Sequence, residues 1–269
     1  MRKRMNTGPV YYSGYTGISI LFIIFLFAIM IGYQQLDWPG WVVFIPVFIY
    51  LILLILGSVF ICFNFYFYSR CKGKTKEKEI AITFDDGPHP EITPRLLNVL
   101  EQQGLPATFF YTGQNVNKYK TILKKAFEKG HIVANHSYSH SRWFDFYNSR
   151  KVILEMENTN KEIEQAIRKK PLLFRPPYGV ANPALGKAIH HTGMMSVGWS
   201  LRSFDTVNSP EKVLKKLKKK TNPGDIVLFH DTLENTPGII EKYARWLKEN
   251  GFEVVPLNKM LKIEVYEEI

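Results

Sequence analysis

Two long apolar runs without charge fill most of the first seventy residues, and they set the strongest limit on how the chain folds. Residues 18–33 and 41–69 contain no Asp, Glu, Lys or Arg, and a short link around Asp37 separates them. A hydrocarbon core of roughly 30 Å requires about 20 apolar residues as helix. Each run reaches that length with its uncharged flanks, so residues 1–70 are predicted to form a membrane anchor with two transmembrane helices.

Two other interpretations of the apolar runs are possible, and the orientation of the anchor in the membrane is ambiguous. A cleaved signal peptide would have a shorter apolar core, and the second run argues against it. A single span with a re-entrant or interfacial piece is the other alternative. Basic residues lie only outside the pair, at positions 2–4 and from Arg70 onward. The positive-inside rule then puts both ends of a hairpin in the cytoplasm, whereas a single span puts the rest of the chain outside. We expect a multi-pass protein of the cell membrane and leave the side open.

The formal net charge of +11 comes mostly from residues after position 70. A basic domain suggests an acidic partner, such as a lipid headgroup, an anionic glycan or nucleic acid. Most of the lysines alternate with glutamates, which favours a solvated surface instead. One dense run also suits a helix end, and we favour that interpretation over a membrane-facing patch. The run consists of Lys215, Lys216, Lys218, Lys219 and Lys220.

The two cysteines of the chain, Cys62 and Cys71, both lie beside the membrane segment. No cysteine follows them. We therefore expect no disulfide framework, no cysteine zinc site and no cysteine nucleophile. The redox compartment stays undecided.

After a polar linker at residues 71–78, apolar runs of strand length alternate with helix-like segments over residues 79–269. This repetition predicts parallel strands with crossover helices, and about seven repeats favour a distorted (β/α)7 barrel over an open sheet. In such barrels, chemistry takes place where strands end. Six polar residues follow strand-like runs and are expected on one rim: Asp85, Asp86, His136, Arg175, Asp205 and His230.

Five short motifs carry these residues. Asp85 and Asp86 precede a Gly-Pro turn, so one carboxylate could bind a metal while the other acts as a base; Asp-Gly-Pro is also ordinary turn chemistry. His136 and His140 are four apart, which places them on one face of a helix or helical turn, as zinc sites often require. A pair of surface histidines is the alternative.

The other three motifs are equally ambiguous when taken singly. Arg175-Pro-Pro-Tyr178-Gly could aim an arginine and a backbone N–H at a reacting centre, or could simply be a rigid loop. Asp205 closes the segment that begins at Trp199. His230 directly follows a buried strand, which suits an acid or a base.

Taken together, TFDDGP, HSYSH, RPPYG and the strand ending in LFH resemble the NodB-type polysaccharide deacetylases, carbohydrate esterase family 4, over residues 78–257. The resemblance implies a barrel of the NodB-homology type and one divalent metal, with Zn²⁺ expected from the ligand set and other divalent transition metals as alternatives. It makes Asp86, His136 and His140 the metal ligands.

The resemblance also assigns the catalytic roles. Asp85 is the general base that activates water, and Arg175 orients it. The Tyr178 backbone N–H stabilises the oxyanion. His230 protonates the leaving amine, and Asp205 tunes it.

One departure concerns the family's D-x-x-D-W pattern. Arg202 occupies the first Asp position and Thr206 occupies the Trp position. This change puts the acyl group and the substrate in doubt more than the reaction class.

Three functions remain open. The first is removal of N-acetyl groups from a hexosamine polysaccharide such as peptidoglycan or an exported glycan. The second is deacylation of a lipid-linked sugar at the membrane surface. The third is an inactive glycan-binding homologue, which the complete residue set argues against. The expected partners are a glycan or lipid-linked sugar and the membrane, with no nucleic acid.

Overall fold

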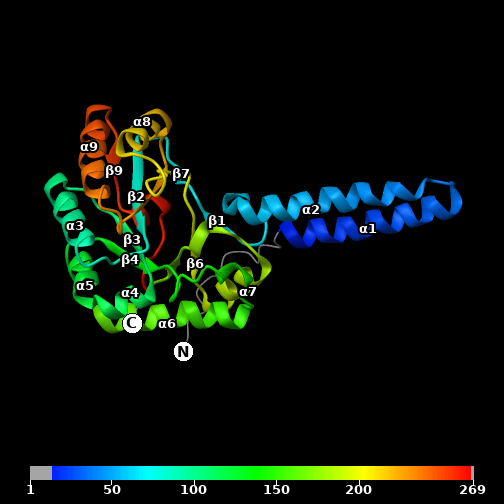
Figure 1. Ribbon diagram of the computed structural model, residues 1–269, viewed down its shortest axis with the longest axis horizontal. Helices are drawn as coiled ribbons and strands as arrows, with labels where there is room; N and C mark the ends of the chain where they lie inside the picture. Colours follow the sequence, from blue (N-terminus) through cyan, green and yellow to red (C-terminus); the bar gives the residue numbers. More distant parts are fainter. Residues whose placement is uncertain (1–13, 268–269) are drawn as a thin grey trace.

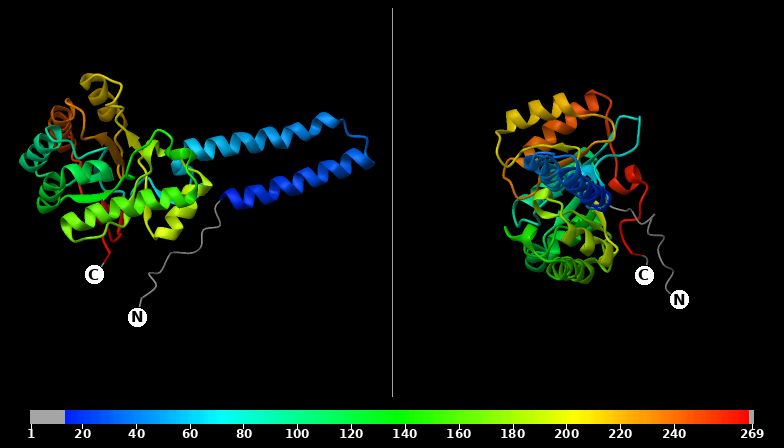
Figure 2. Two further views of the ribbon diagram at one scale, coloured as in Figure 1. Left: turned by 60° about the horizontal axis from the view of Figure 1, so that its bottom comes forward. Right: turned by 90° about the vertical axis from the view of Figure 1, so that its right-hand side faces the viewer.

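The computed structural model describes residues 14–267, so the basic residues at positions 2–4 lie outside the described part of the chain. An antiparallel helical hairpin projects from one side of an α/β domain (Figures 1 and 2). Its helices are α1 (Gly14–Gln35) and α2 (Phe44–Val59), and a 3-10 helix, Gly40–Val43, precedes α2.

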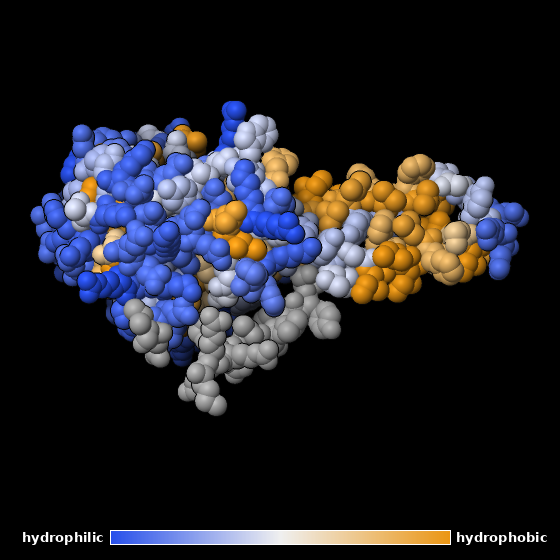
Figure 3. Space-filling view, turned by 90° about the horizontal axis from the view of Figure 1, so that it is seen from below, coloured by the Kyte–Doolittle hydropathy of each residue, from blue (hydrophilic) through white to orange (hydrophobic). Residues whose placement is uncertain are grey.

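Both helices of the hairpin expose many large apolar side chains, and Figure 3 shows one face of this apolar surface. Gly14–Gln35 and Gly40–Val59 have mean hydropathies of 2.4 and 2.9, and both are long and apolar enough to cross a membrane by length and composition. The two helices contact each other where Phe22 stacks on Tyr50, with ring centroids 4.2 Å apart. A core helix of a soluble domain would instead be buried, so the exposed surface is consistent with a lipid environment.

The second apolar run is not one continuous helix. Helix α2 ends at Val59, and Asn64 adopts a left-handed conformation with φ of 54°. The last turn of α2 already contacts the α/β domain, where the Ala181 N–H donates to Ser58 O at 2.9 Å. Beyond Asn64, Phe67 packs against the buried cluster under α7. Apolar composition alone therefore overstates the length of this helix, because aromatic residues that pack on the domain look the same as residues that face lipid.

Cys62 and Cys71 form a disulfide across a sequence separation of 9 residues. This finding corrects the expectation that the chain has no disulfide. The reason is local: the chain turns back after α2, which brings the two positions to a Cα–Cα distance of 5.8 Å, a normal separation for a disulfide. The bond links the end of the hairpin to the first strand of the domain.

Nine strands form the sheet, in the order β1-β6-β5-β4-β3-β2-β8-β7, with β9 paired to β2. All of these ladders are parallel, as strand–helix repetition predicts. The strands are β1 (Ser69–Arg70), β2 (Glu79–Asp85), β3 (Thr108–Tyr111), β4 (Ile132–Asn135), β5 (Leu173–Phe174), β6 (Met195–Val197), β7 (Leu201–Arg202), β8 (Ile226–His230) and β9 (Glu253–Val254).

Helices cover the outer face of this curved sheet (Figure 1). They are α3 (Ile92–Gln103), α4 (Gly113–Lys118), α5 (Lys120–Glu128), α6 (Ser149–Ile167), α7 (Pro183–Thr192), α8 (Pro210–Lys220) and α9 (Thr236–Glu249). Helix α10 (Leu257–Leu261) instead packs on the inner face of the sheet, where Leu257 and Met260 share a buried cluster with Ala81 of β2. Strand β2 shows how the layers form. Ile80, Ile82 and Phe84 enter the core beneath the helices, and the alternate residues Thr83 and Asp85 face the inside of the barrel.

The predicted α/β fold with a distorted parallel barrel and two preceding apolar helices is confirmed. Within the described residues, no ladder joins β1 to β7, so the barrel stays open between them. The sequence did not predict these two end strands. Strand β1 also lies inside residues 1–70, which were assigned to the anchor, and it pairs with β6. Two-residue strands are too short to show the alternation that identifies longer ones.

Candidate active site

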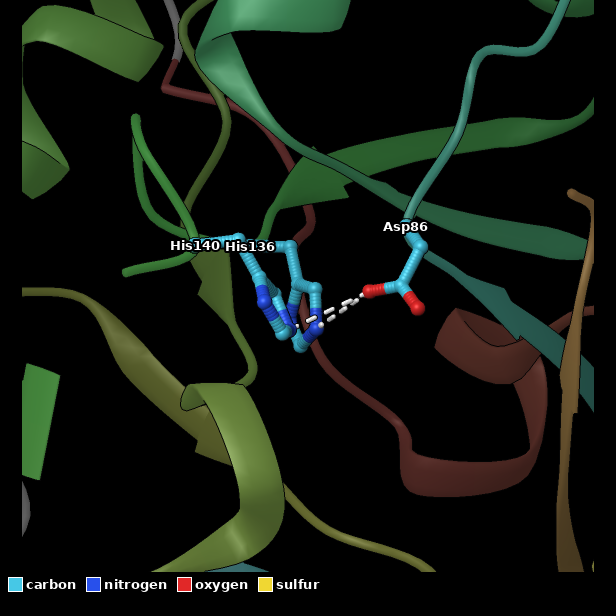
Figure 4. Close-up of side chains that lie close together, drawn as sticks. All are labelled: Asp86, His136 and His140. Carbon is cyan, nitrogen blue, oxygen red and sulfur yellow. Dashed lines mark ion pairs between the residues drawn. The ribbon is translucent and has the colours of Figure 1, made fainter. Parts of the chain in front are cut away.

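Asp86, His136 and His140 converge at the carboxyl ends of the strands (Figure 4). One potential ligand atom from each lies within 4.8 Å of the others. The His136 and His140 Nε2 atoms are 3.4 Å and 3.2 Å from Asp86 Oδ1. That oxygen is buried and makes no hydrogen bond in the described chain. An oxygen left unpaired between two imidazole nitrogens fits a divalent cation.

The histidines do not lie on a helix. Residues 136–140 form a loop after β4, in which Ser137 and His140 have φ of 65° and 45°. The helical turn expected from the i, i+4 spacing is therefore wrong. The left-handed backbone at Ser137 and His140 reverses the direction of the chain within this loop. The reversal brings the imidazole rings of His136 and His140 to the same side, next to Asp86.

Two residues that the sequence did not identify hold this loop. Glu155 on α6 accepts hydrogen bonds from the backbone N–H groups of Tyr138 and Ser139 at 2.9 Å and 2.8 Å. Asn135 accepts one from the Ser137 N–H at 2.9 Å. Nothing in the sequence indicated this role for Glu155, because a glutamate on a helix is ordinarily a surface residue.

The Glu155 contacts lead to a prediction for metal affinity. Glu155→Ala should weaken metal binding about tenfold or more, since residues that orient ligands typically contribute this much. Calorimetric titration with Zn²⁺ measures it. Glu157→Ala on the exposed side of the same helix is the control and should bind as the wild type does. Equal affinity in both variants would show that the loop does not depend on Glu155.

The electrostatic surroundings of the cluster favour the charged form of the Asp86 carboxylate. Burial alone would raise the pKa of Asp86, but His136, His140 and His230 lower it below its ordinary value. Burial and the neighbouring His136 lower the pKa of His140, which suits a neutral ligand. Burial opposes the charged form of His136, yet Asp85 and Asp86 raise its pKa overall. A proton on His136 therefore competes with a cation, and metal affinity should fall at low pH.

Asp85 ends β2 and is held by a buried arginine. Arg175 Nη1 donates to Asp85 Oδ1 at 2.7 Å and to Thr83 Oγ1 at 2.8 Å. Its Nε and Nη2 donate to backbone carbonyls at Val197 and Gly198. With the arginine wholly buried, four hydrogen bonds fix both its plane and the carboxylate. The other oxygen, Asp85 Oδ2, lies 3.8 Å from His136 Nε2, beside the cluster.

The RPPYG segment forms a tight turn next to the cluster. Tyr178 has a left-handed φ of 59°, and its ring packs edge-on against His140 with centroids 4.8 Å apart. Among the backbone hydrogen bonds of the described chain, none is donated by the Tyr178 N–H. That group therefore remains the candidate oxyanion donor that the family resemblance implies.

His230, at the end of β8, faces the cluster from the other side. Its Nδ1 donates to Asp205 Oδ1 at 2.8 Å, and the His230 backbone N–H donates to Asp205 Oδ2 at 2.8 Å. The carboxylate thus fixes both the ring and the tautomer, which leaves Nε2 for the substrate. Burial would lower the pKa of His230, but the hydrogen bond and charge of Asp205 raise it.

All eight residues singled out from the sequence therefore gather at one rim of the barrel. The assignment of a role to each remains a prediction.

Known proteins resemble this chain in sequence and in fold. The family model for polysaccharide deacetylase matches residues 72–197. A peptidoglycan-N-acetylglucosamine deacetylase of Bacillus cereus is 35% identical over 195 residues, covering 69% of this chain and 89% of the relative.

Solved structures agree with the sequence matches. The Bc1960 peptidoglycan N-acetylglucosamine deacetylase superposes with a TM-score of 0.69 at 27% identity, over 78% of this chain and 96% of that one. BA3943 of Bacillus anthracis, a CE4 family pseudoenzyme, superposes with a TM-score of 0.67 at 26% identity, over 72% of this chain and 70% of that one.

The fold and the site are those of a hydrolase built on a parallel half-barrel, with a candidate metal site at the strand ends. The chain belongs to the polysaccharide deacetylase family, carbohydrate esterase family 4. The predicted activity, N-deacetylation of a polysaccharide, is confirmed at this level.

Proposed function

We propose that this chain removes N-acetyl groups from the hexosamines of peptidoglycan, using one Zn²⁺ ion and a site that faces away from the cytoplasm. The observation that carries the proposal is the convergence of Asp86, His136 and His140 beside the Asp85–Arg175 and His230–Asp205 pairs at one rim. The relatives that act on N-acetylglucosamine or N-acetylmuramic acid of peptidoglycan support the choice of substrate.

Asp86, His136 and His140 would hold the metal, which supplies Lewis acidity and lowers the pKa of water. Asp85 takes a proton from the attacking water, because Arg175 holds its carboxylate beside the cluster. The Tyr178 N–H donates to the developing oxyanion.

Collapse of the tetrahedral adduct requires a proton on the leaving amine. His230 provides it through Nε2, since Asp205 holds the other ring nitrogen. The products are acetate and a free amine on the sugar. Amines leave poorly unless they are protonated, so this acid is as necessary as the base.

The raised pKa of His230 leads to a prediction of pH dependence. A raised pKa keeps the ring protonated, and active as an acid, up to a higher pH. Asp205→Asn removes the negative charge, so the pKa of His230 should fall and the alkaline limb of kcat/KM should move to lower pH. If kcat/KM instead fell by the same factor at every pH, with no shift of the alkaline limb, Asp205 would not set the pKa of His230.

The inactive alternative needs separate consideration, because a pseudoenzyme shares this fold. Fold alone therefore does not establish turnover. This chain keeps the ligand cluster, the Asp85–Arg175 pair and the His230–Asp205 pair, each with hydrogen-bonding geometry. These contacts favour an active enzyme over a glycan-binding module.

The location of the domain separates the two remaining substrates. The Cys62–Cys71 disulfide favours an oxidising compartment outside the cytoplasm, where peptidoglycan lies. The basic residues at both outer ends of the hairpin favour the opposite side, where a lipid-linked sugar would be the substrate. We give the disulfide more weight, because flanking charges bias orientation without fixing it.

A reporter enzyme that is active only outside the cytoplasm, fused after residue 269, tests the location. The proposal predicts an active reporter, and an inactive but expressed fusion contradicts it.

Amine formation on intact peptidoglycan and on lipid-linked N-acetylhexosamine tests the substrate. We expect turnover of the polymer, and turnover of the lipid-linked sugar alone would favour the alternative.

A further inference from the structure

An open groove of about 870 Å³ lies where the inner end of α2 meets the α/β domain. One side consists of Val59, Phe60 and Phe63, and the other includes Arg202 of β7 and Lys216 of α8. In Figure 1, β7 lies between α8, at the top of the domain, and the inner end of α2. The catalytic cluster does not line this groove, so a ligand here would be additional to the substrate.

The charged residues that line the groove are mainly cationic. They are Lys72, Arg202, Lys216 and Lys220, with a single carboxylate, Asp225. Asp225 is already engaged, because it accepts hydrogen bonds from Ser200 Oγ and the Asn222 N–H, both at 2.7 Å, and pairs with Lys72 at 3.5 Å. The described chain offers no ion-pair partner to Arg202, Lys216 or Lys220.

These cations lie close together without a counter-charge. The pKa of Lys216 is lowered, by burial first and then by the charges of Arg202 and Lys220. Its Nζ lies 3.5 Å from the centroid of the Phe204 ring, and the Arg202 guanidinium lies 5.1 Å from the same ring. The Arg202 Nε is buried and has no hydrogen-bond partner among the described residues. A buried donor of this kind is costly unless a ligand or water satisfies it.

The apolar side of the groove indicates what kind of anion fits. Phe60 and Phe63 are 49% and 62% exposed, and they continue directly from the apolar surface of α2. A soluble anion gains nothing from these rings. An amphiphile with an anionic phosphate and an acyl chain would contact both sides at once.

We propose that this groove binds the phosphate of an anionic phospholipid in the surrounding membrane, with Arg202, Lys216 and Lys220 around the phosphate and the acyl chain along Phe60 and Phe63. The proposal rests on the membrane anchoring proposed above. Bound lipid would hold β7 and the following loop, which carries Asp205, against the membrane surface. The groove would thus set the orientation of the catalytic rim above the bilayer.

Helix α8 offers a matched pair of variants. Lys216→Glu with Lys220→Glu reverses two charges that line the groove, and Lys218→Glu with Lys219→Glu reverses two that do not. The full chain in non-ionic detergent is titrated with phosphatidylglycerol or phosphatidylcholine, and bound lipid is counted by native mass spectrometry. We expect the wild type and the 218/219 variant to prefer phosphatidylglycerol at least fivefold, and the 216/220 variant to lose that preference.

Several results would overturn the proposal. The preference could survive in the 216/220 variant, or both charge reversals could abolish it equally, which would indicate general surface attraction. Inorganic phosphate that displaces the lipid at equal concentration would point to a soluble ligand. A polyprenyl phosphate bound in place of phosphatidylglycerol would reassign the groove to a lipid carrier. Arg202→Gln gives a milder second test if the 216/220 variant misfolds. Because lipid is counted without substrate, failure of the deacetylase proposal would leave this result unaffected.

Discussion

Asp85→Asn should reduce kcat for deacetylation by a factor of about 10² to 10⁴ and leave the metal bound. The amide nearly matches the carboxylate in shape but cannot take a proton from water, and positioned bases typically contribute this much. Asp85 is not among the three residues that converge as ligands, so metal content should not change. Acetate release and elemental analysis of the same purified sample measure both effects.

The matched control is His136→Ala, which removes one of those three residues. It should lose both activity and metal, so the two variants separate the base from the ligand. Full activity in Asp85→Asn would exclude Asp85 as the base. Loss of metal in Asp85→Asn would move this residue into the ligand set.

The second large effect concerns stability. Arg175→Met should lower the free energy of unfolding by about 3–5 kcal/mol, because it leaves the buried Asp85 carboxylate without its partner. It also removes hydrogen bonds to Thr83, Val197 and Gly198. Activity should fall with stability, since the base is no longer held. Thermal or denaturant unfolding of the detergent-solubilised chain measures the change.

The double variant Arg175→Met with Asp85→Leu shows where this cost comes from. If the unpaired charge dominates, removing the carboxylate should recover part of the lost stability, although the enzyme stays inactive. If the double variant is less stable than Arg175→Met alone, packing around the arginine dominates instead. A single variant within 1 kcal/mol of the wild type would contradict the role given to this pair.

The sequence predicted much of the site because Asp85 and His230 end strands of five residues or more, and His136 follows one of four. Parallel strands present their carboxyl ends at one edge, so Asp85 and His230 are neighbours in space although 145 positions apart. The order of the motifs along the chain was therefore enough to bring them together.

The sequence could not predict features that depend on loop geometry or distant packing. The loop of His136 and His140 has left-handed residues that no residue type at those positions requires. Glu155 acts on this loop from α6, where its own neighbours in sequence give no indication. Cys62 and Cys71 pair only because the chain reverses after α2, and that reversal lies within a uniformly apolar run.

The groove beside α2 also could not be predicted from the sequence. The lysine run of α8 was interpreted as a solvated helix end, and Lys218 and Lys219 are indeed exposed away from the groove. Lys216 and Lys220 line it, because positions four apart share one face of a helix. Arg202, which departs from the family pattern, faces the same space. Only the structure brings these residues next to the end of α2.

The most direct test of the central claim is acetate release from fully N-acetylated peptidoglycan by the purified full chain, before and after chelation and after return of Zn²⁺. We predict release in the untreated enzyme, loss after chelation and recovery when Zn²⁺ is restored, with no recovery in His136→Ala. Unchanged release by the metal-free enzyme, or no release at any metal loading, would contradict a metal-dependent deacetylase at this site.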